Sequence, residues 1–239
     1  MHHYLRTKVG IVVAMGALVL ASGAAALTII GDRGDNDIVG SVGKDRIAAR
    51  AGNDTVHALA GNDRVKAGPG DDRVDAGFGR DQVSGEDGND ILAGLGGHDL
   101  LVGGAGNDQI DGGPEGDVIF GRSGDDVEYG STGNDLMGVG VGVDAEYGGI
   151  GNDRMWALAK DDVAAPGVDT VDAGPGNDVI HTRDGEPDNV TCGDGRDRAK
   201  LDNVDVITDA TPGNPNGSCE KVERADPIGE PEPGKHAHL

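Results

Sequence analysis

Hydrophobic residues recur at every ninth position along most of this chain. Each is an isolated isoleucine, valine or leucine with polar or small residues around it, and a fixed nine-residue period is typical of a repeat architecture. The spacing predicts short β-strands whose middle residue points inward while its two neighbours point outward. The predicted inward ladder comprises Ile29, Ile38, Ile47, Val56, Val65, Val74, Val83, Leu92, Leu101, Ile110 and Ile119.

The residues between these strands follow the pattern Gly-Gly-x-Gly-x-Asp, and 103–111 is the fullest nonapeptide. Between Gly34 and Gly151, only Glu115 interrupts the fourth-position glycine column and only Asn36 the sixth-position aspartate column. Glycine permits the positive φ angles of a tight turn, so one nonapeptide is predicted to be a turn plus a strand. Two nonapeptides then form one coil, and stacked coils form two parallel sheets. At about 4.8 Å per coil, roughly nine coils give a rod on the order of 40 Å long.

The repeated phrase resembles the haemolysin-type calcium-binding nonapeptide of the RTX, or repeats-in-toxin, proteins, over about residues 31–200. The resemblance implies an all-β fold, a right-handed parallel β-roll, with several Ca²⁺ ions held between successive turns on the same edge. The residue types agree, because aspartate and backbone carbonyl oxygens are ligands that Ca²⁺ prefers, and no His or Cys stands at the repeat positions. The predicted metal ligands are Asp45, Asp54, Asp63, Asp72, Asp81, Asp90, Asp99, Asp108, Asp117, Asp126, Asp135, Asp144, Asp153 and Asp178.

Turns 18 residues apart are expected to be neighbours, which places these aspartates in two rows, one along each edge. Stacked carboxylates repel each other strongly unless a cation lies between them. The alternative is that the aspartates only make local hydrogen bonds in their turns, without metal.

Two glutamates, Glu128 and Glu146, break the inward ladder and lie 18 residues apart. The favoured interpretation is a local slip of register that turns Val127 and Tyr129 inward and the glutamates outward. Two other interpretations stay open: a structural role in binding a cation or hydrogen bonds, and an acid pair with a catalytic role.

The outward positions of one predicted sheet change character along the chain. Early positions are polar, as at Arg46, Arg64 and Lys66, whereas later ones are apolar. A contiguous apolar strip of this kind predicts a contact surface for a protein or polysaccharide partner, unless a terminal segment or a second copy covers it. The strip comprises Leu100, Val102, Val118, Phe120, Leu136 and Trp156.

Composition and charge narrow the functional classes. The net charge of −23 argues against nucleic-acid binding and against anionic membrane surfaces, which both need clustered Lys and Arg. With one Trp, three Tyr and two Phe, a single large globular core is not expected.

The two ends of the chain differ from the repeat. Residues 1–26 combine basic residues, an apolar run and a small-residue end, which predicts a secretory signal peptide and an extracellular protein, without membrane insertion. We expect the β-roll over 27–207, a C-terminal cap over 208–224 and a disordered tail over 225–239. Cys192 and Cys219, the two cysteines of the chain, are predicted to pair in this exported setting.

No hydrolase elbow, zinc-protease motif or dinucleotide-binding motif occurs in a suitable context. The sequence therefore predicts a secreted calcium-binding protein that is not an enzyme, whose folding is coupled to Ca²⁺, and which acts as a structural or interaction module at the cell surface or in the matrix. One alternative is a polysaccharide-acting enzyme with its site near Glu128 and Glu146. A second alternative is a toxin-related accessory protein.

Overall fold

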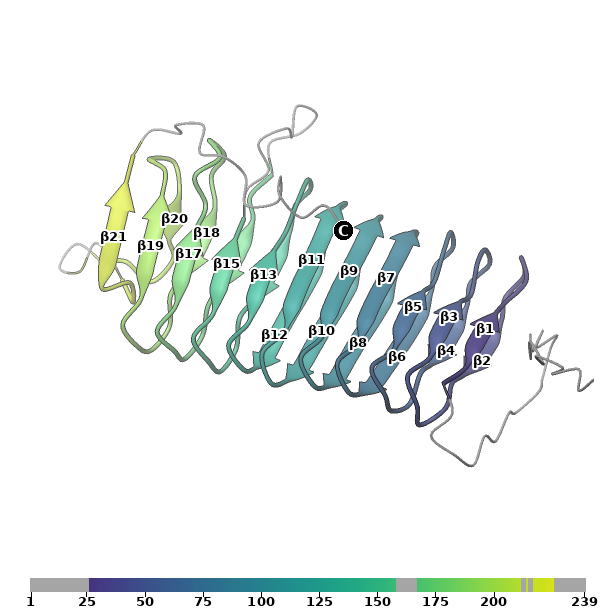
Figure 1. Cartoon of the computed structure of the whole chain (residues 1–239). Helices are drawn as coiled ribbons and strands as arrows, with labels where there is room; N and C mark the ends of the chain where they lie inside the picture. Colours follow the sequence, from purple (N-terminus) through teal and green to yellow (C-terminus); the bar gives the residue numbers. More distant parts are fainter. Residues whose placement is uncertain (1–25, 158–166, 212–213, 215–216, 226–239) are drawn as a thin grey trace, which may run out of the picture.

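The computed structural model describes residues 26–157, 167–211, 214 and 217–225 of the 239-residue chain. Within these residues the regular structure is entirely β, and no helix is present that could span a bilayer. The chain winds into a long solenoid of about ten coils, in which every coil contributes one strand to each of two parallel sheets (Figure 1). The predicted β-roll is confirmed. The weak unit at Asp162, nearly all of the predicted signal peptide and most of the predicted tail lie outside the described residues.

The first sheet, sheet A, is formed by the odd-numbered strands, and each pairs in parallel with the next one along the axis. Its strands are β1 (Thr28–Ile30), β3 (Arg46–Ala48), β5 (Arg64–Lys66), β7 (Gln82–Asp87), β9 (Leu100–Ala105), β11 (Val118–Ser123), β13 (Leu136–Gly138), β15 (Arg154–Trp156), β17 (Val179–His181), β19 (Arg198–Leu201) and β21 (Lys221–Arg224).

Sheet B is formed by the even-numbered strands in the same parallel order. Its strands are β2 (Asp37–Val39), β4 (Thr55–His57), β6 (Arg73–Phe78), β8 (Ile91–Gly96), β10 (Gln109–Pro114), β12 (Val127–Thr132), β14 (Ala145–Tyr147), β16 (Thr170–Asp172), β18 (Asn189–Thr191) and β20 (Val206–Ile207).

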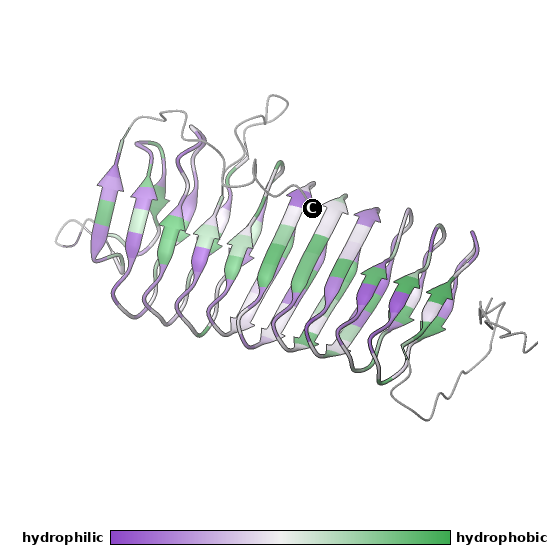
Figure 2. Cartoon of the chain, in the orientation of Figure 1, coloured by the Kyte–Doolittle hydropathy of each residue, from purple (hydrophilic) through white to green (hydrophobic). Residues whose placement is uncertain are grey.

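The core is the narrow space between the two sheets, and the predicted ladder fills it. In sheet A, Ile29 aligns with Ile47 and Ile47 with Val65, and all three are at most 4% exposed. Stacked β-branched side chains suit such a surface because their restricted rotamers pack against the same residue type in the next coil. Figure 2 shows hydrophobic residues at the centres of the middle strands of sheet A, where apolar residues also stand at outward positions.

The register continues across the one irregularity of the repeat. Ala145 in β14 aligns with Thr170 in β16, 25 residues later rather than 18, and both sheets resume their pattern after Gly167. The extra residues are therefore accommodated at one turn without disturbing the stack.

The disulfide between Cys192 and Cys219 is confirmed, with the two Cα atoms 5.2 Å apart. It joins the last full turns to the segment that was predicted to be a cap. That segment contains β21, which pairs with β19, so the end of sheet A is made by residues 221–224.

The turns show a longer period that the nonapeptide hides. At the second position of the phrase, glycine and non-glycine residues alternate from coil to coil, as in Leu59, Gly77, Leu95 and Gly113. Leu59 and Leu95 both have positive φ, at 84° and 70°. A Cβ atom added at Gly113 would overlap the carbonyl oxygen of Leu95 in the preceding coil. The structural unit of the turns is therefore two coils.

We expect Gly113→Ala to destabilise the fold by roughly 2 kcal/mol or more, because alanine would be strained at φ 96° and its Cβ would collide with rigid backbone. The matched control Leu95→Ala changes the same turn position in the preceding coil, where a Cβ is already accommodated, and should cost less than 1 kcal/mol. Urea unfolding of the calcium-loaded protein measures both. Equal losses for the two variants would contradict the two-coil alternation.

Candidate metal centre

Two rows of buried aspartates follow the two turn edges of the solenoid. All of the predicted ligands are at most 3% exposed, although the chain carries 43 acidic residues and most solvent-facing carboxylates lie elsewhere. The sixth residue of each nonapeptide ends the turn just before the strand, so the tight glycine turn directs its side chain inward. The sequence prediction that these carboxylates form rows is confirmed by the register of the strands.

One oxygen of each carboxylate is used to join neighbouring coils. The backbone N–H of Asp72 donates to Oδ1 of Asp90, and the N–H of Asp90 donates to Oδ1 of Asp108, both at 2.8 Å. The other edge repeats this arrangement, with the N–H of Asp81 donating to Oδ1 of Asp99 at 2.8 Å. Each carboxylate thus satisfies an amide of the coil before it, and the row is a continuous hydrogen-bonded ladder.

The second oxygen is buried without a hydrogen-bond partner. This holds for Oδ2 of Asp72, Asp90 and Asp108, and for most other members of both rows. Asp45 differs, because its Oδ2 accepts the backbone N–H of Ser41 at 2.6 Å. A buried carboxylate oxygen without a partner is strongly unfavourable, so this repeated vacancy of partners indicates a missing cation.

Glycine at the first position makes room for these oxygens. A Cβ added at Gly103 would overlap Oδ2 of Asp108, and one at Gly121 would overlap Oδ2 of Asp126. The conserved geometry of turn and carboxylate therefore explains why the phrase begins with glycine in the central coils.

Burial raises the pKa of these carboxyls. The pKa of Asp72 and of Asp108 rises to about 7 and that of Asp90 to about 6, first because burial penalises the charged form and then, for Asp72, because neighbouring carboxylates repel. Such groups accept either a proton or a cation at neutral pH.

The donor chemistry fits calcium. The partnerless Oδ2 atoms are hard, anionic oxygen ligands that recur once per turn, as Ca²⁺ coordination requires. In the described part of the chain, no three acidic, His or Cys side chains gather closely enough to hold an ion by themselves. Backbone carbonyl oxygens of the turns must therefore complete the coordination, consistent with the six to eight oxygen ligands that Ca²⁺ takes.

Both rows extend beyond the residues predicted as ligands. The N–H of Asp144 donates to Oδ1 of Asp169 at 2.9 Å, and that of Asp178 donates to Oδ1 of Asp197 at 2.8 Å. Asp188 and Asp205 continue the first row, again as buried residues. The 25-residue step and the weakened glycine pattern concealed these positions, but the pairing of aspartate with an apolar residue two positions later could have identified them.

The predicted register slip at Glu128 and Glu146 is wrong. The two residues align with each other in β12 and β14, and each is 0% exposed, so both carboxyls point into the core. Outside, Tyr129 and Tyr147 stack with ring centroids 5.1 Å apart, which helps to keep the register. All four carboxyl oxygens lack hydrogen-bond partners. Burial raises the pKa of Glu128 to about 8 and raises that of Glu146 well above its usual value.

The profile of the RTX calcium-binding nonapeptide repeat, in its four-copy form, matches seven overlapping segments of the chain between residues 28 and 186. The chain belongs to the RTX calcium-binding repeat family. Its RTX repeats therefore bind several Ca²⁺ ions. No curated protein matches the chain. Within the RTX array of this protein, the partnerless Oδ2 atoms are the side-chain groups that would hold the ions.

Proposed function

We propose that this protein is a secreted RTX module that becomes ordered when it binds calcium, and that it then serves as a rigid structural or interaction element outside the cell. The partnerless Oδ2 atoms, repeated along both edges, are the observation that carries the proposal. They make the folded solenoid a poor state for the metal-free chain at neutral pH and a good state for the calcium-bound chain.

The aspartate ladder explains why ion binding and folding would be one event. Two coils must be adjacent before the carboxylates of a row lie at coil spacing, and that spacing creates the repulsion which a cation offsets. The net charge of −23 acts in the same direction, because it keeps the metal-free chain expanded. Secretion follows from the predicted signal peptide and from the disulfide, which persists in oxidising surroundings.

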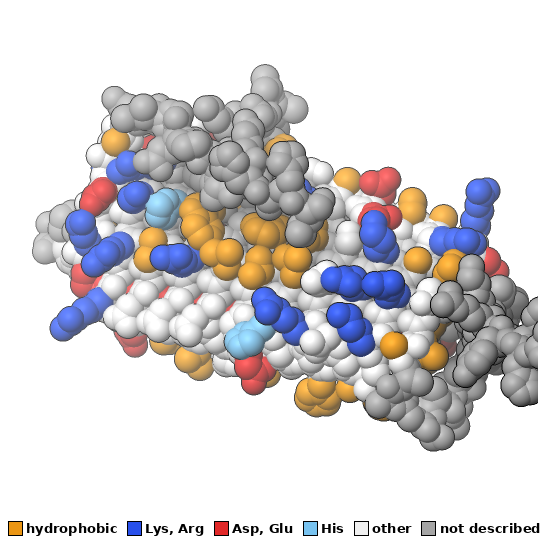
Figure 3. All heavy atoms as spheres, in the orientation of Figure 1, with side chains coloured by type: hydrophobic (Ala, Val, Ile, Leu, Met, Phe, Trp, Pro, Cys, Tyr) orange, Lys and Arg blue, Asp and Glu red, His pale blue; other side chains and the backbone are white. Residues whose placement is uncertain are grey.

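The apolar strip supports the interaction role. Its six members lie on β9, β11, β13 and β15, and the register places Val118 between Leu100 and Leu136. All six side chains are half-buried on the outer face of sheet A. Figure 3 shows them as a continuous hydrophobic area on the side of the rod.

We infer that binding, rather than catalysis, is the activity of this surface. The acid pair offered as a catalytic site, Glu128 and Glu146, is sealed in the core and cannot touch a substrate in this fold.

Calcium titration of the chelator-treated protein tests the proposal. The increase in β circular dichroism should follow the calcium bound, as measured by equilibrium dialysis, and Mg²⁺ at the same concentration should not replace Ca²⁺. Calcium binding without a change in the spectrum would overturn the coupling of binding to folding.

A further inference from the structure

Basic residues gather on one face of this acidic protein. The chain has 20 Lys and Arg against 43 Asp and Glu, yet the outward positions of sheet A carry a single acid, Glu223. On sheet B the balance is reversed, with Asp37, Asp75, Asp111 and Asp172 against Arg73. The basic residues at outward positions of sheet A are Arg46, Arg64, Lys66, Arg154, Arg198, Lys200 and Lys221.

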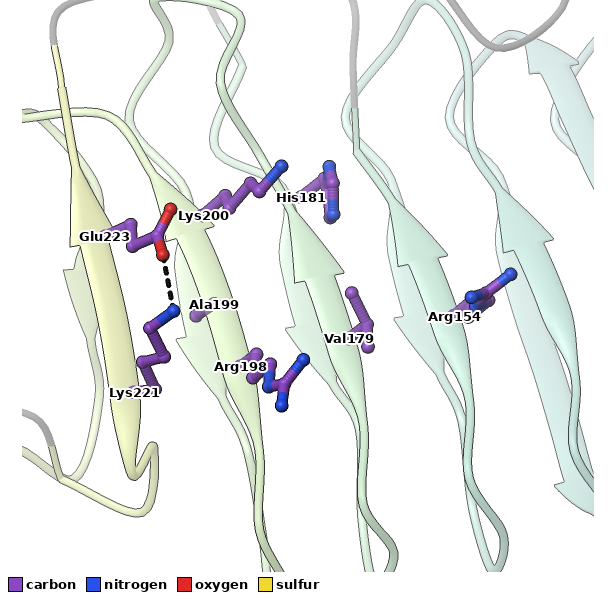
Figure 4. Close-up of a pocket in the computed structure, with 8 residues that line it drawn as sticks. All are labelled: Arg154, Val179, His181, Arg198, Ala199, Lys200, Lys221 and Glu223. Carbon is purple, nitrogen blue, oxygen red and sulfur yellow. Dashed lines mark ion pairs between the residues drawn. The ribbon is translucent and has the colours of Figure 1, made fainter.

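The basic residues of sheet A form two groups, one on each side of the apolar strip. Figure 3 shows Lys and Arg side chains on both flanks of the hydrophobic area. The C-terminal group surrounds a shallow hollow of about 270 Å³ over β15, β17, β19 and β21. Val179 and Ala199 form its apolar floor, and the close-up in Figure 4 shows Arg154 and Arg198 on either side of Val179.

Most of the positive charge in this hollow is not neutralised by the protein. Lys221 pairs with Glu223 at 2.7 Å, as the dashed line in Figure 4 shows. In the described part of the chain, neither Arg154 nor Arg198 has an ion pair, and both are exposed. Guanidinium groups held without a carboxylate, in a chain that is rich in carboxylates, are available for an external anion.

An aromatic pair adjoins the cations. Trp156, the single Trp of the chain, lies on β15 beside Arg154, and its ring centroid is 6.0 Å from that of His181 on β17. Because successive strands are about 4.8 Å apart, the cations form straight rows along the solenoid axis with steps close to the length of one sugar ring. A flat aromatic surface beside such rows suits the apolar face of a sugar.

We propose that the outer face of sheet A, centred on the hollow at Arg154, Arg198 and Lys221, binds a linear anionic polysaccharide that lies along the solenoid axis. Carboxylate or sulfate groups would pair with the basic rows, and a sugar ring would pack on Trp156. The inference deepens the proposed function, on which it rests, by naming the class of partner.

A polysaccharide fits this face better than the other polyanions. An anionic bilayer extends beyond one sheet face and would meet the acidic remainder of a chain with net charge −23. Double-stranded DNA is likewise wider than the basic rows. A single polysaccharide chain touches only the basic face. The composition argument against polyanions holds for the molecule as a whole, but it does not hold locally for sheet A.

The test uses the calcium-loaded protein and a heparin hexasaccharide, with binding followed by Trp156 fluorescence and by calorimetry. We expect saturable binding that weakens with NaCl, and no binding of neutral dextran. The variant R154S/R198S should lose roughly tenfold or more in affinity, since two charge-assisted contacts are removed. Arg73→Ser on sheet B is the matched control and should bind like the parent. Glu223→Gln should bind a few-fold more tightly, because it releases Lys221.

Circular dichroism in the same buffer separates the two proposals. A folded, calcium-bound protein that ignores heparin overturns the polysaccharide site and leaves the proposed function standing, whereas a protein that stays unfolded in calcium overturns the proposed function. Equal losses for Arg73→Ser and R154S/R198S would show general charge attraction and overturn the site. Tighter binding of a single-stranded oligonucleotide with the same charge would assign the face to nucleic acid instead.

Discussion

In calcium-free buffer, the chain is expected to be largely unfolded at pH 7.5 and to regain β structure when the pH is lowered to 5.0. Burial in the solenoid raises the pKa of the row carboxyls, to about 7 at Asp72, Asp108 and Asp126. Because these values lie above the ordinary value of 3.8, protonation of the rows favours the fold. This contribution is complete below the unfolded pKa and is lost as the pH rises through about 6 to 7. A proton would therefore replace calcium as the neutralising group.

Circular dichroism of the chelator-treated protein between pH 7.5 and 5.0 measures this directly. The calcium-loaded protein is the control and should be folded at pH 7.5. A variant with Asn at Asp90, Asp108 and Asp126 removes three central charges and should fold without calcium at a higher pH than the parent. A metal-free spectrum that shows full β structure at pH 7.5, or none at pH 5.0, would contradict the account of the carboxylate rows.

Replacing both core glutamates, as E128V/E146V, is expected to stabilise the calcium-loaded protein by about 2–4 kcal/mol at pH 7.5. The four carboxyl oxygens have no hydrogen-bond partners, and valine is the residue that the inward ladder uses elsewhere. The raised pKa of Glu128, about 8, means that its burial is tolerated below the unfolded value of 4.5 and becomes unfavourable as the pH rises toward 8. The double variant should therefore also flatten the fall in stability over this range.

Urea unfolding at fixed calcium, repeated at pH 5.5, 6.5 and 7.5, supplies both quantities. Ile110→Val in the neighbouring strand β10 is the control; it should lower stability by about 0.5–1.5 kcal/mol and leave the pH dependence unchanged. A double variant less stable than the parent at pH 7.5 would show that the pair holds a stabilising group, such as a cation, in the core.

The nine-residue period predicted the two sheets, the coil length and the carboxylate rows, because one alternating strand pattern fixes which side chains face inward. The inward direction of Glu128 was not predicted, since polarity argued for a slip. In the structure, strands on both sides hold β12 in register, so a slip would break the pairing with β10 as well as with β14. Asp169 and Asp205 were missed for another reason: they follow turns that no longer carry the glycine pattern.

The basic hollow depends on long-range register that a local pattern does not display. Arg154, Arg198 and Lys221 are separated in sequence by irregular intervals, and they align only because the strands after the 25-residue step resume the same sheet. The disulfide, by contrast, could be predicted from the presence of two cysteines in a chain with an export signal.

The alternation of glycine in the turns limits how an array like this one can change length. Loss of the single coil that carries Gly68 and Gly77 would bring Leu95 next to Leu59, whose carbonyl now points at the space that Gly77 leaves open. Loss of two adjacent coils restores a glycine at each such contact. Gene duplications and deletions that preserve the fold should therefore add or remove two coils at a time, so the heritable module is twice the length of the coil and four times that of the visible repeat.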